Sequence, residues 1–249
     1  MGRPILAVFL LLITLVGSAR STDPTTLFPQ LLESQSGAHV IVDFVLNFDA
    51  GGSPQRIQGS VDGVVISADG LVLLAAAVLN PTDLFRQISG EGSSMPNNMR
   101  SNEFRVRIPG RGEPLRATVV TQDTDAGIAW IKLGNPPKDL RFVDLRRARE
   151  PKIGEPAYSI GLVGENNAFA PFIEENRVMG RVEVPFSGYI VSPAARILFG
   201  SDGRPLGYGV IRYAGMPNMA AMGAFKSFAV MVPGPRLQEL TLRARTQIK

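Results

Sequence analysis

The feature that most constrains this chain is a succession of short apolar runs, each ended by a turn rich in Gly, Pro or Asp. The run Leu71 to Leu74 follows Ser67-Ala68-Asp69-Gly70, and Asp202-Gly203 precedes the run that starts at Leu206. An Asp-Gly pair between two apolar runs is a strong signal for a β-hairpin. Because such strands recur at short spacing along the whole chain, the sequence predicts an all-β fold of packed antiparallel barrels.

The chain also shows where its two halves meet and how it ends. Asn135-Pro136-Pro137 interrupts the strand pattern, so we expect one barrel over residues 37–134 and a second over residues 135–249. After Pro235, the residues Leu237, Leu240 and Ala244 recur at helical spacing. This spacing predicts a helix at the end of the second barrel.

The N-terminus has the order of a secretory signal. Arg3 precedes an uncharged apolar run, Ile5 to Val16, and the small residues Gly17, Ser18 and Ala19 follow. The run is shorter than the roughly 20 residues that span a membrane. We therefore expect residues 1–19 to be a cleaved signal peptide and residues 20–36 a flexible leader, with an uncleaved anchor as the alternative. The chain would be exported, periplasmic or extracellular, with no stable membrane insertion after cleavage.

Composition excludes several classes of chemistry. The chain has no cysteine, which rules out a thiol nucleophile and a Cys-based metal site, and its absence fits a bacterial envelope protein. The net charge is only +4, which is small for a nucleic-acid-binding protein of this length. We expect no metal, no cofactor and no nucleic-acid partner.

Five segments of the chain, by their order and spacing, carry a resemblance to a known family. They are VVISADGLVLLAAAV at 64–78, VVTQDTDAGIAWIKL at 119–133, GEPAYSIG at 154–161, SPAARILFGSDGRPLG at 192–207 and SFAVMV at 227–232. Together they resemble the HtrA-type (Deg) family of trypsin-like serine proteases. The resemblance implies two packed six-stranded antiparallel β-barrels with a C-terminal helix, here without a PDZ domain, and it favours a homo-oligomer, a trimer in the family.

The resemblance also locates the family's catalytic triad, and the chain departs from it at all three positions. The His position falls on Ala77, the Asp position on Gly127 and the Ser position on Ala194. The triad works because a Ser attacks, a His takes its proton and an Asp holds the His. Alanine and glycine side chains can do none of this, so we expect a pseudoprotease with no catalytic residues.

What remains is a candidate binding site. The resemblance places Ser192, Arg196, Met216 and Met219 at the cleft between the barrels, where a peptide or protein ligand would bind. The only histidine, His39, is expected to be an ordinary strand residue. Two alternatives stay open. One is a serine endopeptidase with a rearranged or partner-completed site. The other is a structural domain of an envelope assembly, which self-association through residues 27–32 would favour.

Overall fold

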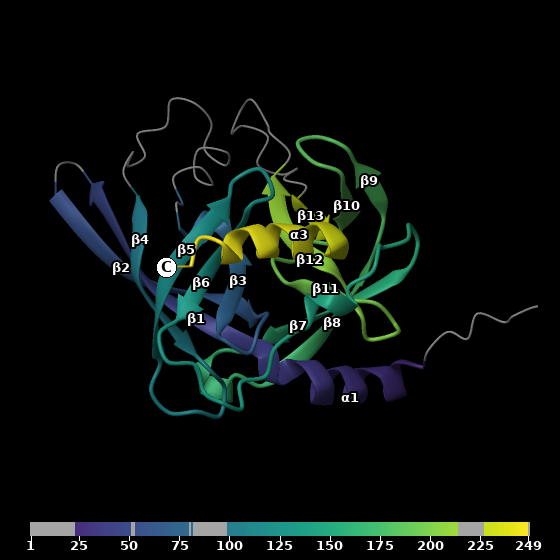
Figure 1. Ribbon diagram of the computed structural model, residues 1–249, viewed down its shortest axis with the longest axis horizontal. Helices are drawn as coiled ribbons and strands as arrows, with labels where there is room; N and C mark the ends of the chain where they lie inside the picture. Colours follow the sequence, from purple (N-terminus) through teal and green to yellow (C-terminus); the bar gives the residue numbers. More distant parts are fainter. Residues whose placement is uncertain (1–22, 51–52, 80, 82–98, 214–226, 249) are drawn as a thin grey trace, which may run out of the picture.

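A computed structural model describes residues 23–50, 53–79, 81, 99–213 and 227–248, and the structural statements below concern this part of the chain (Figure 1). The predicted signal peptide, residues 1–19, lies outside the described residues, as do Met216 and Met219.

The N-terminal half forms a closed barrel of six antiparallel strands, in the order β1-β2-β3-β6-β5-β4. The strands are β1 (His39–Ala50), β2 (Ser53–Val65), β3 (Leu71–Ala75), β4 (Arg100–Arg107), β5 (Leu115–Asp123) and β6 (Ile128–Leu133). The predicted Asp-Gly turn joins β2 to β3, where the Gly70 N–H donates to the Ser67 carbonyl at 3.0 Å. Gly70 has a φ of +85°, a conformation that glycine adopts without strain.

The C-terminal half forms a seven-stranded sheet in the order β8-β7-β11-β12-β13-β10-β9. The strands are β7 (Pro156–Leu162), β8 (Pro171–Arg177), β9 (Gly180–Val182), β10 (Gly188–Val191), β11 (Ile197–Phe199), β12 (Pro205–Tyr213) and β13 (Ser227–Pro233). The two edge strands, β8 and β9, are consecutive in the chain and are separated only by Val178 and Met179.

These two linking residues close the second sheet on itself. The Val178 N–H donates to the carbonyl of Glu155, next to β7, at 3.0 Å, and the Met179 N–H donates to Ile190 of β10 at 2.8 Å. A single bent strand thus pairs with β7 at one end and with β10 at the other. The prediction of two antiparallel β-barrels with a C-terminal helix is confirmed, and in the second barrel one of the six strands is broken into β8 and β9.

Buried side chains form three clusters that follow this architecture. One fills the first barrel and includes Val42, Val72 and Ile131; another fills the second barrel around Leu206 and Met231. The third and largest lies between the barrels and draws residues from both of them and from the two helices. The halves are therefore joined by a shared apolar core.

The N-terminal helix α1 (Pro24–Gln35) corrects the expectation of a flexible leader over the described part of residues 20–36, which begins at residue 23. Asp23 caps it, accepting a hydrogen bond from the Thr25 N–H at 2.9 Å, and proline suits the first helical position. Leu27 and Leu31, one turn apart, are buried in the core between the barrels. Their burial holds the segment in place, and it leaves these leucines unavailable for the self-association that a structural assembly role would use.

The C-terminal helix α3 (Gly234–Arg245) connects the two halves, and its residues Leu237, Leu240 and Ala244 are buried as predicted. Thr241 accepts a hydrogen bond from the indole N–H of Trp130, a β6 residue of the first barrel, at 3.2 Å. In Figure 1 this helix (yellow) lies in front of β12 and β13, which it contacts. Among the described residues, no helix has the length and apolar character needed to cross a membrane.

Candidate functional site

Two of the predicted triad positions are neighbours in the first barrel. β3 pairs with β6, and the ladder ends at Ala75 opposite Ile128. Beyond it, the Ala76 N–H donates to the Gly127 carbonyl at 2.9 Å. Ala77 follows in the single turn Ala76–Val78, where its methyl group is half-buried. The structure therefore places Ala77 beside Gly127 at the end of the β3–β6 ladder.

Gly127 has a backbone and surroundings that leave no room for a side chain. Its φ is +70°, and a Cβ atom there would lie 2.8 Å from Val210 Cγ1 and 3.1 Å from Arg212 Nη2. The preceding turn fixes this geometry, because Asp123 accepts from the Ala126 N–H through its carboxylate and from the Gly127 N–H through its carbonyl, both at 2.8 Å. An aspartate at position 127 would be strained in its backbone and would collide with Val210.

The third position, Ala194, reaches the same region through β12. Ala194 is buried, and a Cβ on Gly209 would lie only 2.3 Å from its carbonyl oxygen. The next residue of β12 is Val210, which contacts Gly127. Two consecutive residues of β12, Gly209 and Val210, thus lie against Ala194 and Gly127 respectively. Since Ala77 is beside Gly127, all three triad positions lie where the two barrels meet.

The loop that carries Ala194, residues 192–196, is tied down on several sides. The Tyr208 hydroxyl donates to the Ala195 carbonyl at 3.1 Å, and the Gly209 N–H donates to the Arg196 carbonyl at 2.8 Å. The Arg196 side chain binds Asp62 of β2 at 2.6 Å and Glu174 of β8 at 2.9 Å. Since Asp62 belongs to the first barrel and Glu174 to the second, Arg196 connects both barrels to the loop.

Ser192 and Arg196, the two described residues predicted for the cleft, therefore differ in role. Arg196 is only 23% exposed, and its guanidinium also lies over the ring of Phe172, 5.5 Å from the centroid. Its positive charge is already paired with two carboxylates, so the role of Arg196 is to connect the two barrels. Ser192 is half-buried, and no side-chain hydrogen bond of its hydroxyl is found among the described residues.

His39, the only histidine, lies in the interior as a strand residue of β1. Its ring is 6.4 Å from that of Phe199, measured between centroids, and its buried Nε2 has no hydrogen-bond partner among the described residues. Burial, and secondarily the positive charge of Arg196, lowers the pKa of His39 to about 3. The imidazole is therefore neutral at physiological pH, and its ring lies near Phe199 of β11 in the second barrel.

Arg212 of β12 is a residue of this site that the sequence analysis missed. Its Nη2 donates to the Asp125 carbonyl at 2.7 Å, beside Gly127. Desolvation lowers the pKa of this half-buried arginine. The available signal was a single charged residue inside the apolar run of residues 205–213, in a strand that follows the candidate site.

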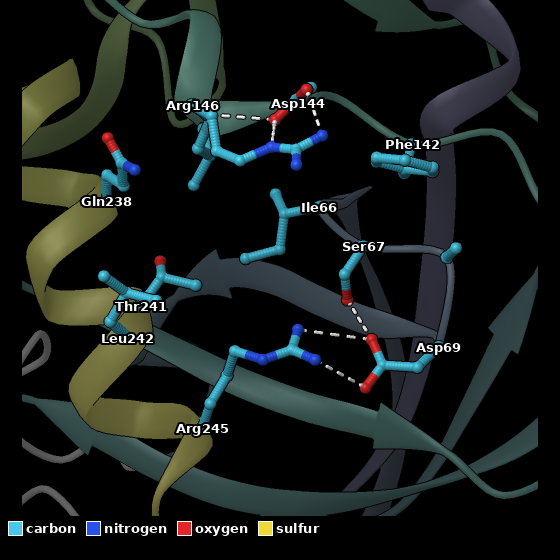
Figure 2. A pocket seen from close by; sticks show the side chains of 12 residues that line it. Ile66, Ser67, Asp69, Phe142, Asp144, Arg146, Gln238, Thr241, Leu242 and Arg245 are labelled. Atoms are coloured by element: carbon cyan, nitrogen blue, oxygen red, sulfur yellow. Dashed lines mark hydrogen bonds and ion pairs between the residues drawn. The ribbon is translucent and has the colours of Figure 1, made fainter.

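A separate pocket of about 440 Å³ lies between helix α3 and the β2–β3 turn (Figure 2). Ile66, Leu145 and Leu242 give it apolar walls, and its lining also includes two ion pairs. In Figure 2 Arg245 points toward Asp69 and forms two hydrogen bonds with its carboxylate, the shorter of them 3.0 Å long. Arg146 pairs with Asp144 at 2.8 Å. None of the three triad positions lines this pocket. Among the described residues, no group of three or more acidic or histidine side chains could hold a metal ion.

Comparison with known proteins accords with the architecture. No curated protein matches the sequence. The family model of the trypsin-like peptidase domain matches residues 61–215, more than half of the chain, from the end of β2 to just beyond β12. The matched segment contains Ala77, Gly127 and Ala194. The chain, with its β-barrel architecture and C-terminal helix, therefore belongs to the trypsin-like peptidase domain family.

Proposed function

We propose that this chain is a non-catalytic, HtrA-type member of the trypsin-like family that binds extended peptides or unfolded proteins where its barrels meet. The observation that carries the proposal is the composition of the site: Ala77, Gly127 and Ala194 gather around β12 and offer neither a nucleophile nor a proton acceptor. Losing one triad member costs a serine protease about 10⁴-fold or more in rate.

The surroundings of the site support the loss of catalysis. Val210 and Arg212 pack against the Cα of Gly127, in the space that an acidic side chain would need. Arg196 fixes the loop that carries Ala194 to both barrels. A rearranged triad would need another base, and His39 is buried, faces Phe199 and has a lowered pKa.

Strand β12 offers an edge for peptide binding. It pairs with β13 through Tyr213, whereas its ladder with β11 ends at Tyr208, and among the described residues the Gly209 N–H bond to Arg196 is the last main-chain hydrogen bond on that side. Because N–H groups of alternate residues point to the same side of a strand, those of Ile211 and Tyr213 face away from β13, as that of Gly209 does. An extended peptide can add to such an edge through main-chain hydrogen bonds.

The test of catalysis uses residues 20–249 and two assays. We expect no hydrolysis of casein and no labelling by a fluorophosphonate probe. Stoichiometric labelling of one serine, with casein cleavage, would show that the site is a rearranged enzyme and would refute the proposal.

The test of binding uses one backbone donor. Ile211→Pro removes an N–H on the open edge while leaving the β13 ladder intact, so we expect it to abolish binding of unfolded casein. Ile211→Ala shortens the side chain but keeps the N–H, and it should bind casein as the unaltered chain does. Equal binding by both variants would show that casein binds elsewhere or not by strand addition.

Export belongs to the same proposal and has its own test. The charged, apolar and small-residue order of residues 3–19 supports secretion with cleavage near Ala19. N-terminal sequencing of the protein from an envelope fraction should begin near residue 20; an intact Met1 would favour a retained anchor. Sedimentation of residues 20–249 tests the trimer that the HtrA-type resemblance favours.

A further inference from the structure

Four arginines of the described chain are half-buried, and three of them share one pattern. Each of the three binds two carboxylates: Arg107 binds Asp43 and Glu165, Arg149 binds Glu155 and Asp202, and Arg196 binds Asp62 and Glu174, at distances of 2.6–3.0 Å. Pairing of this kind offsets the cost of removing a cation from water. Where this protein partly buries an arginine, it therefore ordinarily supplies two anions.

Arg212 is the exception. Among the described residues its guanidinium has one hydrogen bond, to the neutral carbonyl of Asp125 at 2.7 Å, and no carboxylate oxygen within 4.0 Å. The Asp125 carboxylate acts on it only at longer range. A guanidinium has five N–H donors, so most donors of this half-buried cation are not used by the protein.

The position of Arg212 connects these donors to the proposed binding edge. Arg212 lies in β12 between Ile211 and Tyr213, whose N–H groups face the open edge. Its Nη2 lies 3.1 Å from where a Cβ of Gly127 would stand, that is, at the position where the family's acidic side chain would be. The charge at this point of the junction is thus positive where an active protease has a negative one.

We propose that Arg212 receives a carboxylate of the bound peptide, either its C-terminal group or an acidic side chain. This inference rests on the proposed function and gives it a substrate class: extended peptides that carry an anion beside β12. A guanidinium matches a carboxylate because two parallel N–H groups can donate to its two oxygens. A lysine at this position would keep the charge but lose the paired geometry.

The experiment compares peptides that differ only in their anion. Four fluorescein-labelled decapeptide mixtures of neutral residues are titrated by anisotropy with residues 20–249: one with an amide terminus, one with a free carboxylate terminus, and two amide-terminated mixtures with a single Glu or a single Gln. We expect the free-carboxylate mixture to bind about tenfold more tightly than the amide mixture, or the Glu mixture to bind about tenfold more tightly than the Gln mixture. The first comparison tests a C-terminal carboxylate, and the second tests an acidic side chain.

Three variants assign the preference to Arg212. Arg212→Gln should lose the preference, so that it binds each acidic mixture no more tightly than the neutral counterpart, and Arg212→Lys should keep part of the preference. Arg116→Gln removes an exposed arginine of β5 and should leave every affinity unchanged. Melting temperatures confirm that each variant is folded.

The outcomes separate this inference from the proposed function. Equal affinity of the unaltered chain for acidic and neutral mixtures, or a preference that survives Arg212→Gln, would overturn the role of Arg212 while peptide binding stands. Failure of every mixture to bind would overturn peptide binding and the role of Arg212 together.

Discussion

Lowering the pH from 7 to 5 should destabilise this protein through one residue, His39. The imidazole is 4% exposed, and its pKa falls from 6.5 to about 3 in the folded chain. Between these two values the unfolded chain binds a proton that the folded chain does not, so stability decreases as the pH falls. From pH 7 to pH 5 the difference amounts to about 2 kcal/mol, which lowers the melting temperature by roughly 4–8 °C for a chain of this size.

The assay is thermal unfolding at half-unit pH intervals, with His39→Leu as the matched variant. Carboxylates ordinarily titrate near pH 4, and His39 is the only histidine, so the leucine variant should be nearly flat between pH 7 and pH 5. The single histidine NMR signal of the folded protein should not titrate over this range. A flat profile for the unaltered chain, or the same slope in both proteins, would refute the reasoning.

Three further changes test other parts of the structure. Gly127→Ala should destabilise the protein more than Gly110→Ala, because both glycines have a positive φ but only Gly127 is packed against another side chain; equal melting temperatures would contradict this. The triple variant Ala77→His, Gly127→Asp, Ala194→Ser should not hydrolyse casein, and strong turnover would show that the site is still organised for catalysis. Arg196→Met should cost about 1–3 kcal/mol in urea unfolding, since it leaves two carboxylates without their cation; a loss no greater than that of Arg212→Gln would contradict the inter-barrel role.

The features that the sequence predicted correctly are local ones. The turn at Asp69-Gly70 requires a residue with positive φ between two apolar runs, and the terminal helix follows from the spacing of Leu237, Leu240 and Ala244. Both signals lie within a few residues of the structure they produce. Helix α1 had comparable signals in its Asp23 cap and its leucine spacing. The burial that stabilises this helix, however, comes from partners far away in the sequence, such as Tyr158, whose ring centroid lies 5.6 Å from that of Phe28.

The features that were missed depend on pairs far apart in the chain. Arg196 finds its carboxylates 134 and 22 positions away, and Arg212 contacts a carbonyl 87 positions away. The bend between β8 and β9 likewise exists because Val178 and Met179 donate to different strands. The sequence identifies which side chains are charged, but it does not predict which of them form contacts at the junction of the two barrels.

The hydrogen bond from Trp130 to Thr241 gives this protein an intrinsic spectroscopic reporter. Trp130 is the only tryptophan of the chain, it is 2% exposed, and its indole N–H contacts the C-terminal helix. Its fluorescence emission should therefore shift to longer wavelength when helix α3 detaches and water reaches the indole ring. Loss of the contact between the helix and the core can then be followed by emission, without attaching any dye.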